Sequence, residues 1–310
     1  MKWLSDDKLN HLRSVVSEPD FSATKYTFVQ ELGRGGMGTV YLAEDRELDR
    51  LIAIKVLNTP DVTEDLRNRM IREAQIIARL EHPGIVPVHD VGTLPDGRIY
   101  YAMKYVRGSR LDEYAAQGAP LRDRLRKFQS VCDAVAFAHA HGVIHRDLKP
   151  QNIMIGSFGE VLVLDWGVAK IRDDPRSSAS FETMEGTVIG TRRYMSPEQI
   201  RGEIDQLDER ADIYALGAVL YFLLHGQPKV SKAAHAICSK AMANAKENRY
   251  SSASDFSADI GRLLDAEPVS AYRENAFEKV SRWVGKNRFL VLLVLAYLLM
   301  RIFLIFTARS

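Results

Sequence analysis

The sequence predicts an α+β protein, in which a small antiparallel β-sheet lobe with one helix precedes a larger helical lobe and a C-terminal apolar helix. Three observations predict this class. Segments rich in β-branched and aromatic residues fill most of residues 26–106. Helical spacing of apolar residues dominates from there to residue 265. Residues 289–307 are then apolar with a single charged interruption, which is typical of a helix that crosses a membrane.

We expect four parts along the 310 residues. They are an N-terminal appendage at 1–25, a domain at 26–265 with lobes at 26–105 and 106–265, a basic juxtamembrane segment at 266–288, and a transmembrane helix at 289–307. Apolar residues make up 46% of the chain, so a sizeable core can form. The net charge of +2 gives no support to nucleic-acid binding, and we expect none.

One stretch of the helical lobe carries most of the information about chemistry. Residues 145–152 read His-Arg-Asp-Leu-Lys-Pro-Gln-Asn and follow a helical pattern over 122–141. A strand pattern over 160–164 then ends on Asp-Trp-Gly at 165–167. Two carboxylates, an amide and a lysine are thus placed on loops between regular elements, where catalytic groups concentrate.

A glycine-rich stretch lies at the start of the small lobe, where residues 33–40 read Gly-Arg-Gly-Gly-Met-Gly-Thr-Val. Such glycines also occur in dinucleotide-binding folds, but those folds need a helix directly after the glycines. The β-branched and aromatic residues at 39–42 favour a hairpin instead. In a glycine hairpin the backbone N–H groups can approach phosphates without obstruction by side chains.

A lysine in the next strand needs an anionic partner. Lys55 lies within the apolar run 51–57, and an unpaired ammonium group is costly to bury. Glu73 lies in a predicted helix over 64–80 and can supply the negative charge. We therefore expect these two side chains to meet.

Taken in order, these motifs make the chain resemble the eukaryotic-type (Hanks-type) serine/threonine protein kinases, in particular the bacterial membrane-anchored ones. The resemblance covers residues 26–265. It implies the bilobal protein-kinase fold, with ATP and Mg²⁺ (or Mn²⁺) in the cleft between the lobes. It also implies transfer of the γ-phosphate of ATP to Ser/Thr hydroxyls of protein substrates, by positioning and electrostatic stabilisation and without a covalent intermediate.

The resemblance also assigns roles to individual residues. Asp147 would accept or orient the proton of the substrate hydroxyl, and Lys149 would neutralise charge on the transferring phosphoryl group. Lys55, oriented by Glu73, would contact the α- and β-phosphates. The residues that would hold the metal ion are Asn152 and Asp165. The remaining ATP-binding positions line the glycine loop and the adenine pocket: Leu32, Gly33, Gly35, Gly36, Gly38, Val40, Ala53, Met103, Tyr105, Val106 and Met154.

Residues 170–189 form the activation segment that the resemblance implies. Arg146 predicts activation by a phosphate in this segment, because the phosphate would offset the positive charge of the arginine. Thr191 would lie in the substrate-binding (P+1) region, and Glu198 would pair with Arg249. Self-phosphorylation between two molecules would involve a homodimer. The candidate phosphosites are Thr183, Thr187, Ser177, Ser178 and Ser180.

The chain departs from the family pattern at three places. Trp166 replaces the usual phenylalanine and Ser196 the usual alanine, and we expect little harm from either. Between Leu224 and a predicted helix at 236–241 the family normally carries a longer segment, with an extra helix that takes part in substrate docking. The short segment here puts the recognition of protein substrates in doubt, but it leaves the phosphate-transfer residues untouched.

The C-terminal apolar run predicts attachment to a membrane. As a helix, Phe289 to Phe306 would be about 27 Å long, close to the hydrocarbon thickness of a bilayer. Arg301 lies past the midpoint, from where its side chain can reach the interface. The basic residues before the run are Arg273, Lys279, Arg282, Lys286 and Arg288, whereas only Arg309 follows it. This bias predicts a single-pass protein of the inner or plasma membrane, with its kinase domain in the cytoplasm.

Two other functions stay open at this point. One is a catalytically weak, kinase-like scaffold that signals through nucleotide-dependent binding. The shortened segment after Leu224 favours that interpretation, and the complete set of catalytic residues opposes it. The other is a small-molecule phosphotransferase of related fold, which the complete peptide-binding segment over 191–198 opposes.

Overall fold

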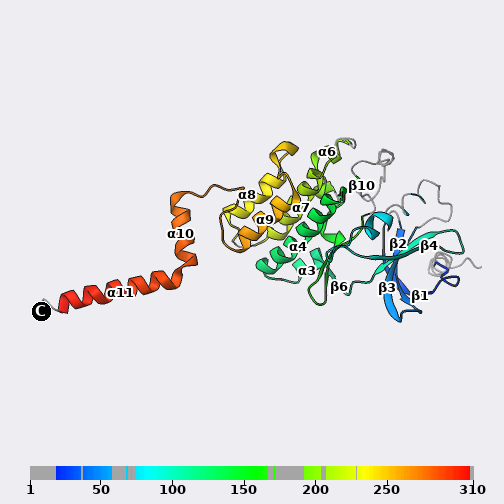
Figure 1. Cartoon of the computed structure of the whole chain (residues 1–310), viewed down its shortest axis with the longest axis horizontal. Coiled ribbons are helices and arrows are strands. Elements are labelled where there is room, and N and C mark those ends of the chain that lie inside the picture. The colour runs from blue at the N-terminus through cyan, green and yellow to red at the C-terminus, as the bar shows by residue number, and fades with distance from the viewer. Residues whose placement is uncertain are drawn as a thin grey trace, which may run out of the picture.

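The computed structural model describes residues 19–35, 38–57, 68, 71, 74–166, 170–171, 192–203, 207–227 and 229–307. Figure 1 shows two lobes, one built mainly of strands and one of helices, and a C-terminal tail that leads away from the helical lobe. The bilobal α+β architecture that the sequence predicts is confirmed.

The small lobe is built on a five-stranded antiparallel sheet with the order β1-β2-β3-β5-β4. Its strands are β1 (Tyr26–Arg34), β2 (Gly38–Asp45), β3 (Arg50–Leu57), β4 (Val88–Thr93) and β5 (Ile99–Lys104). The two faces of the sheet belong to different cores. Ile52, Ile54 and Val56 pack in a small outer core, whereas Ala53 and Met103 pack in the large core that continues into the helical lobe. Strand β3 therefore links the two cores.

The helical lobe is organised around α7 (Arg210–Leu224), which is apolar around most of its circumference. Ile213, Leu216 and Leu220 of this helix are fully buried. The helices that pack on α7 are α4 (Leu121–Ala140), α8 (Lys232–Ala241) and α9 (Ala253–Leu264). Two shorter helices, α3 (Leu111–Ala116) and α6 (Pro197–Ile200), complete the described part of this lobe.

Two small sheets frame residues 145–152. One joins β6 (Gly108–Arg110), β8 (Ile153–Gly156) and β9 (Val161–Val163), and the other joins β7 (Val143–Ile144) to β10 (Lys170–Ile171). The stretch itself runs from β7 through a 3₁₀ turn, η1 (Pro150–Asn152), into β8. Strand β9 also bonds to the small lobe, because Val163 N donates to Gly84 O at 2.9 Å and Val163 O accepts from Val86 N at 3.3 Å. This framing holds the stretch at the junction of the lobes.

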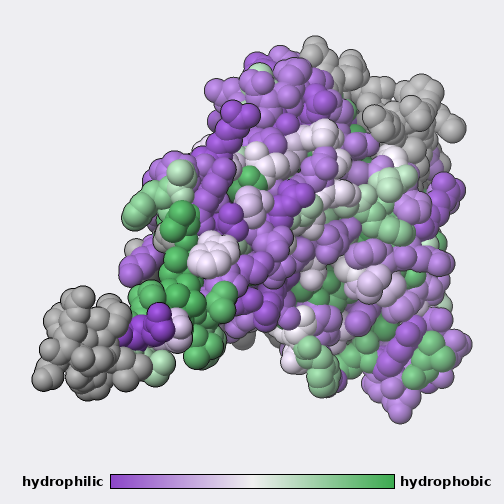
Figure 2. Space-filling view, turned by 60° about the vertical axis from the view of Figure 1, so that its left-hand side comes forward, coloured by the Kyte–Doolittle hydropathy of each residue, from purple (hydrophilic) through white to green (hydrophobic). Residues whose placement is uncertain are grey.

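The C-terminal tail contains two helices, α10 (Ala276–Lys286) and α11 (Arg288–Thr307). Helix α10 forms within residues 266–288, for which the sequence predicts only a basic juxtamembrane segment. A reciprocal cap begins this helix, because Asn275 Oδ1 accepts from Glu278 N and Glu278 Oε2 accepts from Asn275 N. Figure 2 shows hydrophobic side chains gathered on the tail, beside a largely hydrophilic helical lobe.

None of the described helices is, by itself, long and apolar enough to cross a bilayer. Ala276–Lys286 and Phe289–Arg301 meet that requirement together, with a bend of 89° between them.

Candidate active site

The loop at 145–152 brings three of the predicted catalytic side chains together. Lys149 Nζ donates to Asp147 Oδ2 at 2.8 Å. Asn152 Nδ2 donates to the backbone oxygen of Asp147 at 2.8 Å and to its Oδ2 at 3.1 Å. The carboxylate of Asp147 is thus fixed by a lysine and an amide, which both donate to the same oxygen, Oδ2.

The lysine of β3 reaches the same place from the small lobe. Lys55 Nζ lies 3.2 Å from Asp165 Oδ1, across the junction of the lobes. The strand register puts Val40 opposite Lys55 and Met103 opposite Ala53. Because side chains of paired residues and of residues two apart share one face of a sheet, these four residues form one surface. That surface is the side of the sheet that faces the helical lobe.

Asp165 has the electrostatics of an ionised ligand. Desolvation by the surrounding lobes raises the pKa of its carboxyl, but the charge of Lys55 and its hydrogen bond lower it, as do the charges of His145 and Lys149. The net effect holds the pKa of Asp165 below its usual range. The side chain still keeps 46% of its surface accessible. It is therefore both charged and reachable by a ligand.

Two residues of the site have backbone angles that side chains rarely adopt. Arg146 has φ 69° and Asp165 has φ 54°. Such a conformation costs about 1–3 kcal/mol for a residue other than glycine, and it persists only where the surroundings enforce it. The two residues flank the predicted catalytic groups, so the surrounding contacts must hold them.

Asp212, at the start of α7, supplies this constraint at Arg146. It is 1% exposed, and its carboxylate accepts from His145 N, Arg146 N and His139 Nε2, each at 2.8 Å. Desolvation raises its pKa, but the hydrogen bond and charge of His139 and the charge of His145 outweigh this and keep the pKa below its usual range. No role was predicted for Asp212 from the sequence. The available signal was a carboxylate inside an otherwise apolar helix, which requires buried partners.

Trp166 fills the position where the family pattern has phenylalanine. It is fully buried, its ring centroid lies 4.6 Å from that of His145, and its Nε1 donates to Val163 O at 3.3 Å. Its indole N–H therefore has an acceptor, as a buried tryptophan requires. His145 Nε2 lies 3.0 Å from Leu164 O, which ties the two loops of the site together.

The glycine loop forms the predicted hairpin between β1 and β2. Gly35 N donates to Gly38 O at 2.9 Å, and Gly33 pairs with Val40 across the strands. A Cβ atom at Gly38 would lie 2.5 Å from Val56 O, so β2 can approach β3 only with glycine there. Leu32, at the end of β1, is exposed.

The other predicted ATP-binding residues lie on both sides of the connection between the lobes. Ala53, Met103 and Val106 are buried in the large core, and Tyr105 and Met154 pack against it. The predicted residues that lie outside the described part of the chain are Gly36, Glu73, Thr183, Thr187, Ser177, Ser178, Ser180 and Thr191.

The donor set fits a small, hard cation. Asp165 offers a carboxylate, and Asn152 offers an amide oxygen whose orientation is set by the two bonds that its nitrogen donates to Asp147. Magnesium favours such oxygen ligands and takes its remaining ligands from water and substrate phosphates. Within the described ranges no group of three or more His, Cys, Asp or Glu side chains could hold a metal by itself. A metal here would depend on the phosphates.

A buried ion pair joins the segment after the activation region to the helical lobe. Arg249 Nη1 and Nη2 donate to the two carboxylate oxygens of Glu198 at 2.6 Å and 2.8 Å. Both side chains are almost completely buried. The pairing that the sequence predicts between these residues is confirmed. Gln199, in the same short helix, donates from Nε2 to Arg146 O at 2.8 Å and so supports the loop at 145–152.

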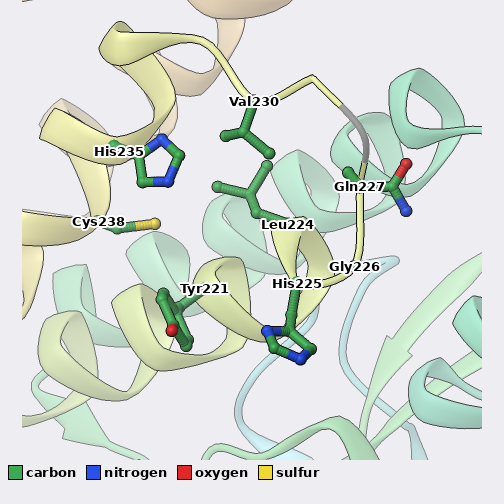
Figure 3. A pocket seen from close by; sticks show the side chains of 8 residues that line it. All are labelled: Tyr221, Leu224, His225, Gly226, Gln227, Val230, His235 and Cys238. Atoms are coloured by element: carbon green, nitrogen blue, oxygen red, sulfur yellow. The ribbon is translucent and has the colours of Figure 1, made fainter.

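The connection from α7 to α8 consists only of residues 225–231. It borders a hollow of about 280 Å³ (Figure 3), lined by residues of α7, α8 and the connection. In Figure 3 Leu224 and Val230 point toward each other, while His235 and Cys238 come from α8. None of the lining residues is a predicted catalytic or ATP-binding residue. The chain therefore departs from the family pattern away from the catalytic side chains.

Comparisons with known proteins agree with this arrangement. The family model described as protein kinase domain matches residues 26–268. Serine/threonine-protein kinase PknB of Mycobacterium tuberculosis is 37% identical over 290 aligned residues, which cover 83% of this chain and 45% of that protein. Probable serine/threonine-protein kinase PknB of Lactococcus lactis is 36% identical over 269 residues, covering 77% of this chain and 42% of that protein. The chain thus spans less than half the length of the curated relatives that it matches.

A solved kinase-domain structure is also similar to this chain. The crystal structure of the Mycobacterium tuberculosis PknI kinase domain aligns with a TM-score of 0.59 and 28% sequence identity. The alignment covers 77% of this chain and 96% of that one.

Proposed function

Because this chain belongs to the protein kinase family, we propose that it is an active serine/threonine protein kinase that uses Mg-ATP. One observation carries the proposal. Side chains from two lobes and two loops, Lys55, Asp147 and Asp165, converge with Lys149 and Asn152 on one site. The scaffold alternative is not favoured, because no charged or amide residue of this set is replaced.

The proposed reaction is a direct transfer. A substrate hydroxyl oxygen bonds to the γ-phosphorus while the bond to the β-phosphate oxygen breaks, and the hydroxyl proton passes toward Asp147. Asp147 can orient that hydroxyl because Lys149 and Asn152 hold its carboxylate. Lys149 stands close enough to this carboxylate to neutralise charge on the transferring group. Lys55 would contact the α- and β-phosphates from β3, and oriented N–H groups of the glycine loop would cover them.

A magnesium ion at Asn152 and Asp165 would neutralise negative charge on the phosphate oxygens when it is bound. Manganese has the same preference for oxygen ligands and is a second candidate. The low pKa of Asp165 keeps its carboxylate ionised for this purpose at neutral pH.

We also propose that a phosphate in residues 170–189 activates the enzyme. Arg146 is largely buried beside the catalytic aspartate, and desolvation lowers its pKa against the opposing charge of Asp212. A desolvated guanidinium group gains strongly from a phosphate partner. The five Ser/Thr candidates and the P+1 residue Thr191 remain predictions.

The test is phosphate incorporation by the purified full chain with ATP and magnesium, followed by mapping of phosphosites. We expect Ser/Thr phosphorylation within residues 170–189, and a rate per molecule that rises with protein concentration if two copies act on each other. Asp147→Asn and Lys55→Met should each lower incorporation by at least about 10²-fold. Asp265→Asn and Lys104→Met, at exposed positions, are the matched controls. Equal labelling of Asp147→Asn and the wild type would refute the proposed catalytic role.

We further propose that α11 anchors the kinase in a membrane, with the kinase domain in the cytoplasm. Support comes from the twenty residues of α11 (Arg288–Thr307), which extend about 30 Å. Apart from the half-buried Val291, its large apolar side chains at 289–300 are exposed instead of packed on the domain. The full chain should stay with membranes after carbonate extraction, and protease added outside sealed cells should leave the kinase domain intact. Recovery of the full chain without detergent in the soluble fraction would contradict the anchor.

A further inference from the structure

Helix α10 has two faces of opposite character. Four large apolar side chains lie on one face and are exposed: Phe277 (81%), Val280 (60%), Trp283 (55%) and Val284 (38%). Their spacing of three, four and seven residues places them along one side of a helix. Exposed apolar residues gathered in this way mark an interaction surface.

The polar face of α10 is already occupied by the protein itself. Glu278 accepts from Lys232 Nζ of α8 at 2.8 Å and from Tyr272 Oη at 3.0 Å. Arg282 Nε lies 2.9 Å from Glu274. These contacts turn the polar side toward the helical lobe and its linker and leave the apolar side uncovered among the described residues.

The linker that precedes α10 is fastened to the helical lobe. Asp259 of α9 is fully buried, and it accepts from Ser270 N at 2.8 Å, Ser270 Oγ at 2.7 Å and Ala271 N at 3.1 Å. Val269 beside them is buried in the core. The orientation of α10 is therefore linked to that of the kinase domain.

The direction of α10 relative to α11 indicates what covers the apolar face. The two helices meet at 89°. If α11 runs along the bilayer normal, as proposed above, α10 lies in the plane of the membrane surface. Tryptophan is enriched at that level of a bilayer, and Lys279 and Lys286 stand beside Trp283 at the edge of the apolar face, as in helices that bind anionic lipid surfaces.

We propose that α10 lies flat on an anionic phospholipid bilayer, with Phe277, Val280, Trp283 and Val284 in the boundary between headgroups and acyl chains. Its polar face and the anchored linker then hold the α8–α9 end of the helical lobe against the membrane. The kinase would thus have a fixed orientation at the surface instead of hanging from a free linker. This inference rests on the proposed span by α11.

The test uses the full chain in lipid nanodiscs, with one environment-sensitive fluorophore attached to a single introduced cysteine. Burial raises the pKa of Cys132 far above its usual value and that of Cys238 to about 12, so these native thiols should react slowly; unsubstituted protein serves as the labelling control. Phe277→Cys and Val280→Cys report on the apolar face. Gly285→Cys, where a side chain meets open space, reports on the opposite face, and Leu295→Cys reports on α11.

We expect probes at 277 and 280 to be quenched by lipids brominated near the headgroup, since such helices insert about 5–10 Å, and less so when the anionic lipid is replaced by a zwitterionic one. The probe at 285 should be quenched by aqueous iodide, and the probe at 295 by deeply brominated lipids. Each labelled variant must phosphorylate itself like the wild type.

Four results would overturn the inference. Iodide quenching at 277 and 280 equal to that at 285, with deep quenching at 295, would leave the span intact and refute the flat helix. Protection of 277 and 280 from both iodide and bromine would show that protein, such as a second copy, covers the face. Lipid quenching at 285 equal to that at 277 would make α10 part of a bent span. Loss of deep quenching at 295 would refute the span itself and the flat helix with it.

Discussion

The catalytic loop at 145–152 and the α7–α8 connection at 225–231 lie at opposite ends of α7 and are built very differently. Asp212 and Gln199 bond to the backbone of the catalytic loop from two other helices. The α7–α8 connection is short and borders a hollow of about 280 Å³. We infer from this contrast that the chain keeps the proposed phosphate transfer, whereas the docking of protein substrates, which the short connection puts in doubt, is weakened.

Of the changes outside the catalytic residues, we expect the greatest loss of activity from Asp212→Asn, because this change should loosen the catalytic loop. The amide keeps one acceptor but turns N–H donors toward donors of the loop, and an unsatisfied buried donor costs about 1–3 kcal/mol. We expect a loss of self-phosphorylation of about 10²-fold, because a displacement of the loop by about 1 Å misplaces the catalytic group. Affinity for Mg-ATP should change much less, since Lys55 and Asp165 are untouched.

Single-turnover phosphorylation, nucleotide titration and urea unfolding separate these effects for Asp212→Asn. The matched control is again Asp265→Asn, which makes the same chemical change at an exposed position. A rate and an unfolding free energy equal to those of the wild type would show that the bonds to His145 N and Arg146 N do not hold the loop.

The second prediction concerns acid and the buried pair of Glu198 and Arg249. Desolvation raises the pKa of Glu198, but the hydrogen bonds and charge of Arg249 outweigh this and lower it from 4.5. The folded protein therefore binds fewer protons at this site than the unfolded chain does. The pair contributes its full stability above about pH 4.5, and this contribution is lost as pH falls through the folded pKa.

Glu198→Gln should lower the unfolding free energy at pH 7 by about 3 kcal/mol, because it leaves Arg249 buried without a counter-charge. As the pH falls below about 5, the unfolding free energy of this variant should also decrease less steeply than that of the wild type. We expect only a modest loss of activity at neutral pH. Urea unfolding across this pH range measures both effects, and Glu203→Gln, in a more exposed pair with Arg201, is the control. Identical pH slopes for Glu198→Gln and the wild type would contradict the assignment.

The sequence was sufficient for the parts of the site whose chemistry is local. The order of the residues at 145–152 and 165–166 along the chain was enough to predict that their side chains would meet, and the structure brings Asp147, Lys149 and Asn152 together; their catalytic and metal-binding roles stay predictions. The pairing of Glu198 with Arg249 also followed from the family pattern, and the structure confirms it.

The sequence did not predict features that depend on a contact between residues far apart in the chain, or on a short run of helical apolar spacing. Asp212 lies more than sixty residues from the loop that it holds, so only the cost of burying its charge could have indicated a role. Helix α10 was missed because its basic residues suggested a simple charged segment. The apolar spacing of Phe277, Val280 and Val284 after the cap at Asn275 was the signal that could have identified it.

Lengthening the α7–α8 connection should have the least effect on self-phosphorylation of the changes considered. We predict ordinary Mg-ATP binding and self-phosphorylation but weak activity on generic proteins in solution, because the docking surface is reduced while the catalytic loop is intact. Self-phosphorylation should suffer less, since tethering on one membrane raises the effective concentration of the two copies.

Grafting the longer family segment between Gly226 and Ala236 should therefore increase activity toward soluble protein substrates and leave self-phosphorylation unchanged. The measurement is kcat and KM for a generic substrate with and without the graft, and a graft of the same length made of Gly and Ser is the control for spacing alone. An ordinary KM for a generic protein in the ungrafted chain would show that a longer α7–α8 connection is dispensable. It would contradict the prediction that the short connection weakens the binding of protein substrates.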